Sequence, residues 1–196
     1  MLTKKEADKL MKIEGEVRGM APKVDLEFII EKKGEQGLKK VETKMAELGF
    51  PLKYKEIRVM DFYPLGMDVI LMLVIKEVFN FDEKDFEQWG RSVVKFSLFL
   101  KIFMKYFSSL KLTAKQIPKI WRKYYTVGNL EIPEFSEERR YAILRMRNFQ
   151  IHPIYCNILG GYYSKVTEMV VKAPVTCKET KCMFRGDKYH EYLLTW

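Results

Sequence analysis

The side chains of this chain that are best suited to bind a metal lie close to its C-terminus. All three cysteines and both histidines of the 196 residues come after residue 150. Thiolate, imidazole and carboxylate groups are the usual ligands of zinc, and a structural zinc site takes four of them. A Glu-x-x-Cys pair at a turn, a His on the next strand and a Cys on a preceding helix could meet within a few ångströms. These candidate ligands are Cys156, Glu179, Cys182 and His190.

The residues alone leave other interpretations open. A buried cysteine usually behaves as a small hydrophobic residue, and the spacing is not that of a CxxC zinc finger. Cys177 lies two residues before Glu179, so on a regular strand both side chains share a face. Cys177 could therefore replace Glu179 as a ligand, since a thiolate is the softer donor. A redox pair of Cys177 and Cys182 is disfavoured, because nothing nearby indicates an activated thiol.

Composition and patterning are typical of a globular cytoplasmic protein. Hydrophobic residues make up 47% of the chain, and the N-terminus lacks the apolar run of a signal peptide. The longest apolar stretches, residues 69–75 and 96–104, are too short to span a bilayer. An odd number of cysteines without scaffold spacing suits a reducing compartment. We therefore expect a cytoplasmic protein with no membrane span.

The formal net charge of +9 raises the question of nucleic-acid binding. Lysines extend along the chain, from Lys4 to Lys119, and alternate with Glu and with apolar positions as on the outer faces of amphipathic helices. No arginine-rich block or recognised nucleic-acid-binding motif accompanies them. We therefore expect that this domain does not contact nucleic acid directly.

The first two-thirds of the sequence is mainly helical in pattern. Within the helical N-terminal segment, residues 1–60, Asp25 is a candidate N-cap and Gly34 a candidate stop, while Gly49 ends the following helix. Residues 54–62 alternate weakly and suggest a short strand. Residues 66–81 are apolar nearly all round, which predicts a central helix.

Two more helices are expected before the pattern changes. Asp82 can cap one that runs past Trp89 towards Phe107, and Thr113 begins another that Gly128 ends. Pro118 lies early in the second helix, where its missing N–H costs least.

The C-terminal third has the pattern of a β-α-β-β unit, residues 139–196. Residues 139–149 alternate with a period of two, residues 153–170 are helical apart from a Gly-Gly pair, and two strands follow around an Arg-Gly-Asp turn at residues 185–187. The sequence thus predicts one α+β domain over residues 1–196. Its helix-rich first two-thirds would pack on a small antiparallel sheet formed mainly by the C-terminal third.

The segment 139–196 resembles the 4-vinyl-reductase-type small-molecule-binding domain. That family has a Cys at the start of a helix with a Gly-Tyr/Ser element, then Glu-x-x-Cys, Gly-Asp and a last Cys. Here these are Cys156, residues 160–164, Glu179 to Cys182, residues 186–187 and His190 in place of the last Cys. The resemblance implies a structural zinc ion on these four side chains, and a fold shared with TRAPP-type vesicle-tethering subunits and haem-based nitric-oxide sensors.

The same resemblance implies a regulatory function. A domain of this type senses a small, apolar or hydrocarbon-like ligand and passes the event to a homodimer partner or to a downstream signalling or transcription-regulating domain. The alternatives are a protein-assembly module of the vesicle-tethering type and an accessory protein to tetrapyrrole vinyl reduction. We expect no enzymatic activity, because four protein ligands leave a metal no open position and the common catalytic motifs are absent.

The resemblance does not identify the ligand. The haem-based relatives use a histidine on a helix and a Tyr-x-Ser-x-Arg element, and neither pattern occurs here; the chain also has no histidine before His152 to hold a phenol hydroxyl. An apolar cavity could be lined by aromatic side chains of the middle segment, although each is more often a core residue. These candidates are Phe62, Tyr63, Phe96, Phe99, Phe103, Phe107, Trp121, Tyr124 and Phe135.

Overall fold

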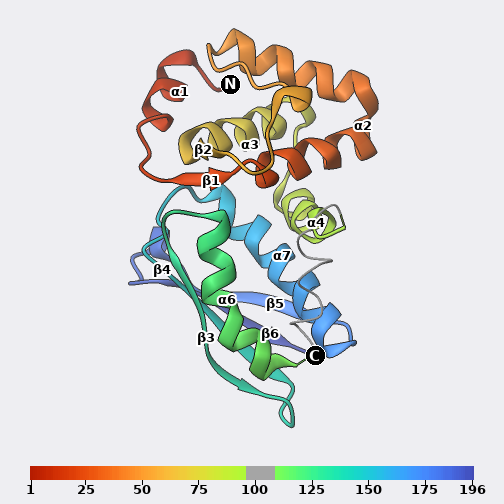
Figure 1. The fold of residues 1–196 in the computed structure, drawn as a ribbon, viewed down its shortest axis with the longest axis vertical. Coiled ribbons are helices and arrows are strands. Elements are labelled where there is room, and N and C mark those ends of the chain that lie inside the picture. Colours follow the sequence, from red (N-terminus) through yellow and green to blue (C-terminus); the bar gives the residue numbers. More distant parts are fainter. Residues whose placement is uncertain (96–108) are drawn as a thin grey trace. The chain divides into compact units, whose positions relative to one another are not determined.

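The computed structural model describes residues 1–95 and 109–196 (Figure 1). The chain divides into two compact units. The N-terminal unit comprises residues 1–85 and 124–126, and the C-terminal unit comprises residues 86–123 and 127–196. None of the helices in the described ranges combines the length and the hydropathy needed to cross a bilayer.

The N-terminal unit is built mainly from helices. Its elements are α1 (Lys4–Leu10), β1 (Glu16–Arg18), α2 (Met20–Glu47), a 3-10 helix (Tyr54–Glu56), β2 (Phe62–Pro64) and α3 (Leu65–Phe79). Helix α3 is buried along most of its length, as its apolar sequence predicts, and Val69, Ile70 and Ile75 are fully buried. The two short strands pair with each other in an antiparallel ribbon.

Two details of this unit differ from the expectation. Asp25 is not an N-cap, because α2 begins at Met20 and takes Pro22 into its first turn, where proline is tolerated. The expected strand over 54–62 is also wrong. Its start is a 3-10 helix, and only Phe62–Pro64 pair, because β1 offers a partner three residues long. Gly34 does interrupt the helix, with φ 66° and ψ −175°.

The C-terminal unit contains the sheet. Helix α4 (Glu83–Val93) begins in the N-terminal unit and belongs to the C-terminal unit from residue 86 onwards. The described elements that follow are α6 (Leu110–Tyr124), β3 (Asn129–Ser136), β4 (Tyr141–Arg147), α7 (Ile154–Val171), β5 (Thr176–Lys181), a 3-10 helix (Met183–Arg185) and β6 (His190–Thr195). The strands form one antiparallel sheet in the order β3-β4-β6-β5. The prediction of an α+β fold with a small C-terminal antiparallel sheet is confirmed.

The expected β-α-β-β unit corresponds to β4, α7, β5 and β6. The alternation in β4 places Ala142, Leu144 and Met146 in the core, as the period of two predicts. The sequence pattern does not predict strand β3, since it alternates poorly and carries Pro133, which is tolerated at the edge of a sheet. Phe149 fills the space between helices, with Trp121 of α6 and Tyr155 of α7 both packed edge-on against it.

Candidate metal-binding site

Four side chains with metal-binding groups converge at one end of α7, all within the C-terminal unit. Their potential ligand atoms lie within 4.8 Å of one another. The Sγ atoms of Cys156 and Cys182 are 3.8 Å apart, and Cys156 Sγ lies 4.0 Å from Nδ1 of His190. That Nδ1 is in turn 3.1 Å from Oε1 of Glu179. The structure therefore brings together the four candidates named from the sequence.

Cys156 is positioned by the first turn of α7. The helix begins at Ile154, and the Cys156 N–H donates to the carbonyl of Pro153. Burial, with the nearby Glu179 and Cys182, raises the pKa of the Cys156 thiol far above its ordinary value. Cys156 is thus a neutral thiol on its own, and a bound cation would have to displace its proton.

Cys182 is held by the turn between β5 and β6. Its N–H donates to Oδ2 of Asp187 at 2.8 Å, and the Asp187 N–H donates back to the Cys182 carbonyl at 3.2 Å. Gly186 has φ 95°, a conformation that favours glycine. The Arg-Gly-Asp segment is therefore a turn, as expected, and it fixes the direction of the Cys182 side chain.

Glu179 has a different partner for each carboxylate oxygen. Oε1 accepts from His190, and Oε2 lies 3.3 Å from the Arg185 guanidinium. Burial works to raise the pKa of Glu179, but the hydrogen bonds of His190 and Cys182 and the charge of Arg185 outweigh it, so the pKa is lowered. Glu179 is therefore an anion at neutral pH.

His190 completes the group from the first position of β6. Its side chain is buried, and its ring lies beside that of Phe184, with centroids 5.6 Å apart. The pairing of β5 with β6 shifts register between Glu179 and Lys181. Such a bulge redirects side chains, and the sequence carries no signal that would locate it.

Cys177 lies outside the group. Its Sγ faces α7 about one turn further along the helix, 4.0 Å from where a Cβ at Gly160 would lie. Burial raises the pKa of its thiol to about 12. The geometry therefore selects Glu179 and not Cys177, and the cysteines it brings together are Cys156 and Cys182.

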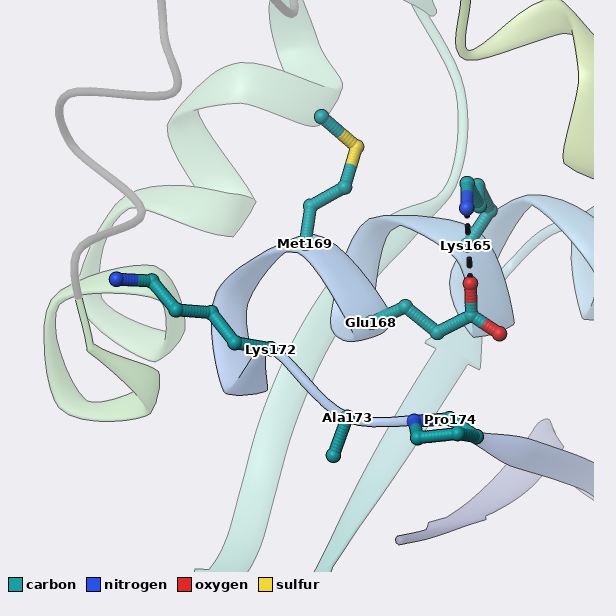
Figure 2. Close-up of a pocket in the computed structure, with 6 residues that line it drawn as sticks. All are labelled: Lys165, Glu168, Met169, Lys172, Ala173 and Pro174. Atoms are coloured by element: carbon teal, nitrogen blue, oxygen red, sulfur yellow. Dashed lines mark hydrogen bonds and ion pairs between the residues drawn. The ribbon is translucent and has the colours of Figure 1, made fainter.

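A pocket of about 330 Å³ lies at the opposite end of α7 (Figure 2). It is open to solvent, and the Lys165 ammonium lies 3.0 Å from Oε2 of Glu168 at its edge. About 20 Å of helix separates it from Cys156. It is not the apolar cavity that was expected among the aromatic side chains of the middle segment. Its lining residues are Lys165, Glu168, Met169, Lys172, Ala173 and Pro174.

The aromatic residues proposed as a cavity lining differ in their surroundings. Trp121 is a core residue whose Nε1 donates to the Val127 carbonyl at 2.9 Å. Phe62 is exposed, with the Arg18 guanidinium 4.1 Å from its ring centroid. Four of the candidates lie outside the described residues: Phe96, Phe99, Phe103 and Phe107.

Solved structures match this fold over most of the chain. An H-NOX protein from S. oneidensis in the Fe(II)NO ligation state superposes with a TM-score of 0.68 at 11% identity, covering 90% of this chain and 97% of that one. An oxygen-binding H-NOX domain related to soluble guanylate cyclases gives 0.64 at 11% identity, covering 91% and 94%. A structure described in terms of haem redox potential and porphyrin distortion gives 0.64 at 10% identity, covering 91% and 99%.

These matches establish the fold alone, because so few residues are identical. No protein-family model matches the chain, and no curated protein does. The expected sharing of a fold with haem-based nitric-oxide sensors is confirmed. The 4-vinyl-reductase-type and vesicle-tethering likenesses receive no support from the comparisons.

The expectation of a zinc cofactor is corrected by the same comparisons. One of the three structures described above is described with Fe(II) and another with haem, and none of the three is described with zinc. The reason for the error is chemical. Thiol, imidazole and carboxylate groups suit several transition metals, so four converging donors do not identify an ion.

Proposed function

We propose that this chain is a regulatory small-molecule-sensing domain, the input module of a signalling or transcription-regulating protein. The observation that carries the proposal is the agreement in fold with H-NOX domains over nine-tenths of the chain. One of those domains binds oxygen and another is seen with NO on Fe(II). The same fold would here bind a small molecule and transmit the event to a homodimer partner or a downstream domain.

Haem is the cofactor that this fold implies, and the histidines present do not fit it. The chain has only two histidines. His152 precedes α7, and its Nδ1 accepts the Ile154 N–H at 3.1 Å; His190 is buried on a strand against Glu179. Neither lies on a helix, so the helical histidine that the haem-based sensors use has no counterpart. We therefore propose direct binding of a small apolar ligand, without a histidine-ligated haem.

We also propose that the four converging side chains hold a transition-metal ion. Tetrahedral donors at bond lengths of about 2.0–2.3 Å lie about 3.3–3.8 Å apart. Three of the pairs here are separated by 3.1–4.0 Å, and all four ligand atoms lie within 4.8 Å of one another, so a small inward shift would bring them to that spacing. Four protein ligands leave no position for substrate or water, which favours a structural role and a domain without enzymatic activity. The ion would join the β5–β6 turn to the start of α7.

The protein-assembly alternative is less well supported. Such a module should present a large apolar surface. Within the described residues the exposed large hydrophobic side chains are few, and two of them lie two residues apart: Met1, Met60, Phe62 and Leu112. The tetrapyrrole alternative rests on the 4-vinyl-reductase-type likeness, which no family model supports.

The sensing proposal is tested by thermal unfolding of the purified chain with small aromatic and aliphatic compounds. A ligand present at about 100 times its Kd should stabilise the chain by about 2.7 kcal/mol, which is a rise in Tm of roughly 5–10 °C. Haemin is titrated in parallel. A His-ligated haem spectrum lost in a His152→Ala or His190→Ala variant would contradict the proposal, as would the absence of any stabilising compound.

The metal proposal is tested by mass-spectrometric metal analysis of protein purified without a metal-affinity column. We expect about one transition-metal ion per chain, lost in Cys182→Ser and retained in Cys177→Ser, because only Cys182 belongs to the cluster. Equal metal content in both variants, or folded wild-type protein free of metal, would remove the site and leave the sensing proposal to the ligand experiment.

A further inference from the structure

The net positive charge of this protein comes from one stretch of the sequence. Residues 88–130 contain nine Lys and Arg and no Asp or Glu, so they carry the whole formal net charge of +9. The rest of the chain is electrically balanced. Lysines do occur throughout the sequence, but elsewhere acidic side chains compensate them. A local excess of this size produces a directional electrostatic potential.

Helix α6 displays five of these nine cations on one face. Its core side is formed by Leu110, Thr113, Ile117 and Trp121, all buried. At about 100° per residue, the exposed side chains fall within an arc of about 120° that extends about 18 Å along the helix. They are Lys111, Leu112, Lys115, Lys119, Arg122 and Lys123. We call these six residues the α6 face (Figure 1, green helix).

Four of the five cations of this face are available to an external partner. In the described ranges, Lys111, Lys115, Lys119 and Arg122 make no ion pair or hydrogen bond through their side chains. Arg91 differs from these four cations, because it belongs to the same stretch of residues 88–130 but forms an ion pair with Glu168. Unneutralised cations that repel one another have no stabilising role in the fold, and an anionic partner would relieve that repulsion.

The composition of the face favours a particular kind of partner. Lysine is depleted in protein–protein interfaces, where arginine is preferred, whereas clusters of four to eight basic residues on amphipathic helices bind anionic lipid surfaces. Leu112 lies among the cations and is 45% exposed. An apolar side chain can enter the headgroup region of a bilayer but gains nothing from a phosphate backbone.

We propose that the α6 face binds peripherally to the surface of an anionic lipid bilayer. The lysines and Arg122 contact the headgroup region, and Leu112 inserts between headgroups. The domain is thereby brought to a membrane without a membrane-spanning helix. This inference rests on α6 alone and does not depend on the proposed ligand or on the metal.

The experiment is co-sedimentation of the full chain with vesicles of phosphatidylcholine, with and without phosphatidylserine, in dilute buffer and at high salt. The test variant is Lys111→Glu/Lys115→Glu/Lys119→Glu. The matched control, Lys32→Glu/Lys39→Glu/Lys40→Glu, makes the same change in net charge on exposed positions of α2. Circular dichroism verifies that both variants fold. A Leu112→Ala variant separates insertion from charge.

We expect wild-type binding to anionic vesicles only, abolished by salt and reduced about 100-fold in the α6 variant. The α2 control should bind within about twofold of wild type, and Leu112→Ala should bind more weakly to vesicles. Equal losses in both triple variants would show an effect of net charge and overturn the proposal. Failure of the wild-type protein to bind anionic vesicles would also overturn the proposal. In that case, a gel shift with duplex DNA would assign the α6 face to nucleic-acid binding.

Discussion

At the scale of single residues, Glu168 joins several charged and polar groups outside the metal-binding cluster. Its carboxylate pairs with Arg91 of α4 and lies 3.0 Å from the Lys165 ammonium. Arg91 also donates to Oγ of the buried Ser164 at 2.6 Å, and that hydroxyl donates to the Val175 carbonyl at 2.8 Å. These bonds tie α4 and α7 to the residue before β5.

We expect Glu168→Gln to lower the free energy of unfolding by about 1–3 kcal/mol at pH 7. Burial works to raise the pKa of Glu168, but hydrogen bonds from Arg91 and Lys165 outweigh it and lower the pKa. A carboxyl group whose pKa is lower in the folded than in the unfolded chain stabilises the fold when it is ionised. This stabilisation is fully present above the unfolded pKa of about 4.3 and is lost as the pH falls through the folded pKa. The difference between variant and wild type should therefore shrink below about pH 4.

Urea unfolding at neutral and acid pH measures the difference in unfolding free energy between Glu168→Gln and wild type. The control is Glu131→Gln, whose partner Arg147 forms a surface pair in which both side chains are 44% exposed. A surface pair contributes at most about 1 kcal/mol. If the Glu168 variant matched this control at pH 7, or kept its full deficit at acid pH, the ionic role of Glu168 would be refuted.

At the scale of elements, α4 and α7 approach each other through glycines. A Cβ at Gly90 would lie 1.9 Å from the Ile158 carbonyl oxygen, and one at Gly161 would lie 2.0 Å from that of Glu87. Real Cβ atoms do not come so close to backbone. Helix α7 itself continues without a break through the Gly160-Gly161 pair. Gly161 therefore permits the close approach of α4, and the Gly-Gly pair does not make a turn.

We expect Gly161→Ala to destabilise the chain by about 3 kcal/mol, because the rigid backbone of Glu87 cannot move aside without separating the helices. Gly160→Ala is the matched control. The nearest atom to its added Cβ is 3.9 Å away, on Tyr192. Alanine is the better helix former, so Gly160→Ala should be neutral or stabilising by up to about 1 kcal/mol. Guanidinium unfolding compares them, and equal stabilities would contradict the close crossing of α4 and α7.

At the scale of the whole molecule, the chain divides into two compact units, and the metal-binding cluster belongs to one of them. All four of its side chains come from α7, β5, the turn after it and β6. A change at the cluster should therefore act first on the C-terminal unit.

We expect a chelator to speed hydrogen exchange in the β5–β6 hairpin and the start of α7, because removing the ion releases the link between them. Exchange in α3 of the N-terminal unit should not change. Mass-spectrometric hydrogen exchange measures both regions in one experiment, with Cys182→Ser as a second way to remove the ion. Uniform acceleration through both units would contradict a local role of the ion.

The sequence by itself determined the elements whose signals are local. The apolar run of α3, the alternation of β4, the cap at Asp82 and the turn at Gly186 each depend on neighbours a few residues away. Periodicity and capping record such local requirements directly. For the same reason the α+β class and the order of elements in the C-terminal third could be predicted.

Tertiary structure decided what depends on residues distant in the sequence. Strand β3 exists because β4 offers it a partner, and the expected strand over 54–62 fails because β1 is short. Glu179 and Cys177 share a face of β5, so the sequence could not choose between them as ligands. The structure places Glu179 beside Cys156 and places Cys177 beside Gly160, one turn further along α7. The α6 face likewise appears only when the core side of the helix is known. Strand pairing and packing partners are set by long-range contacts that local patterns do not contain.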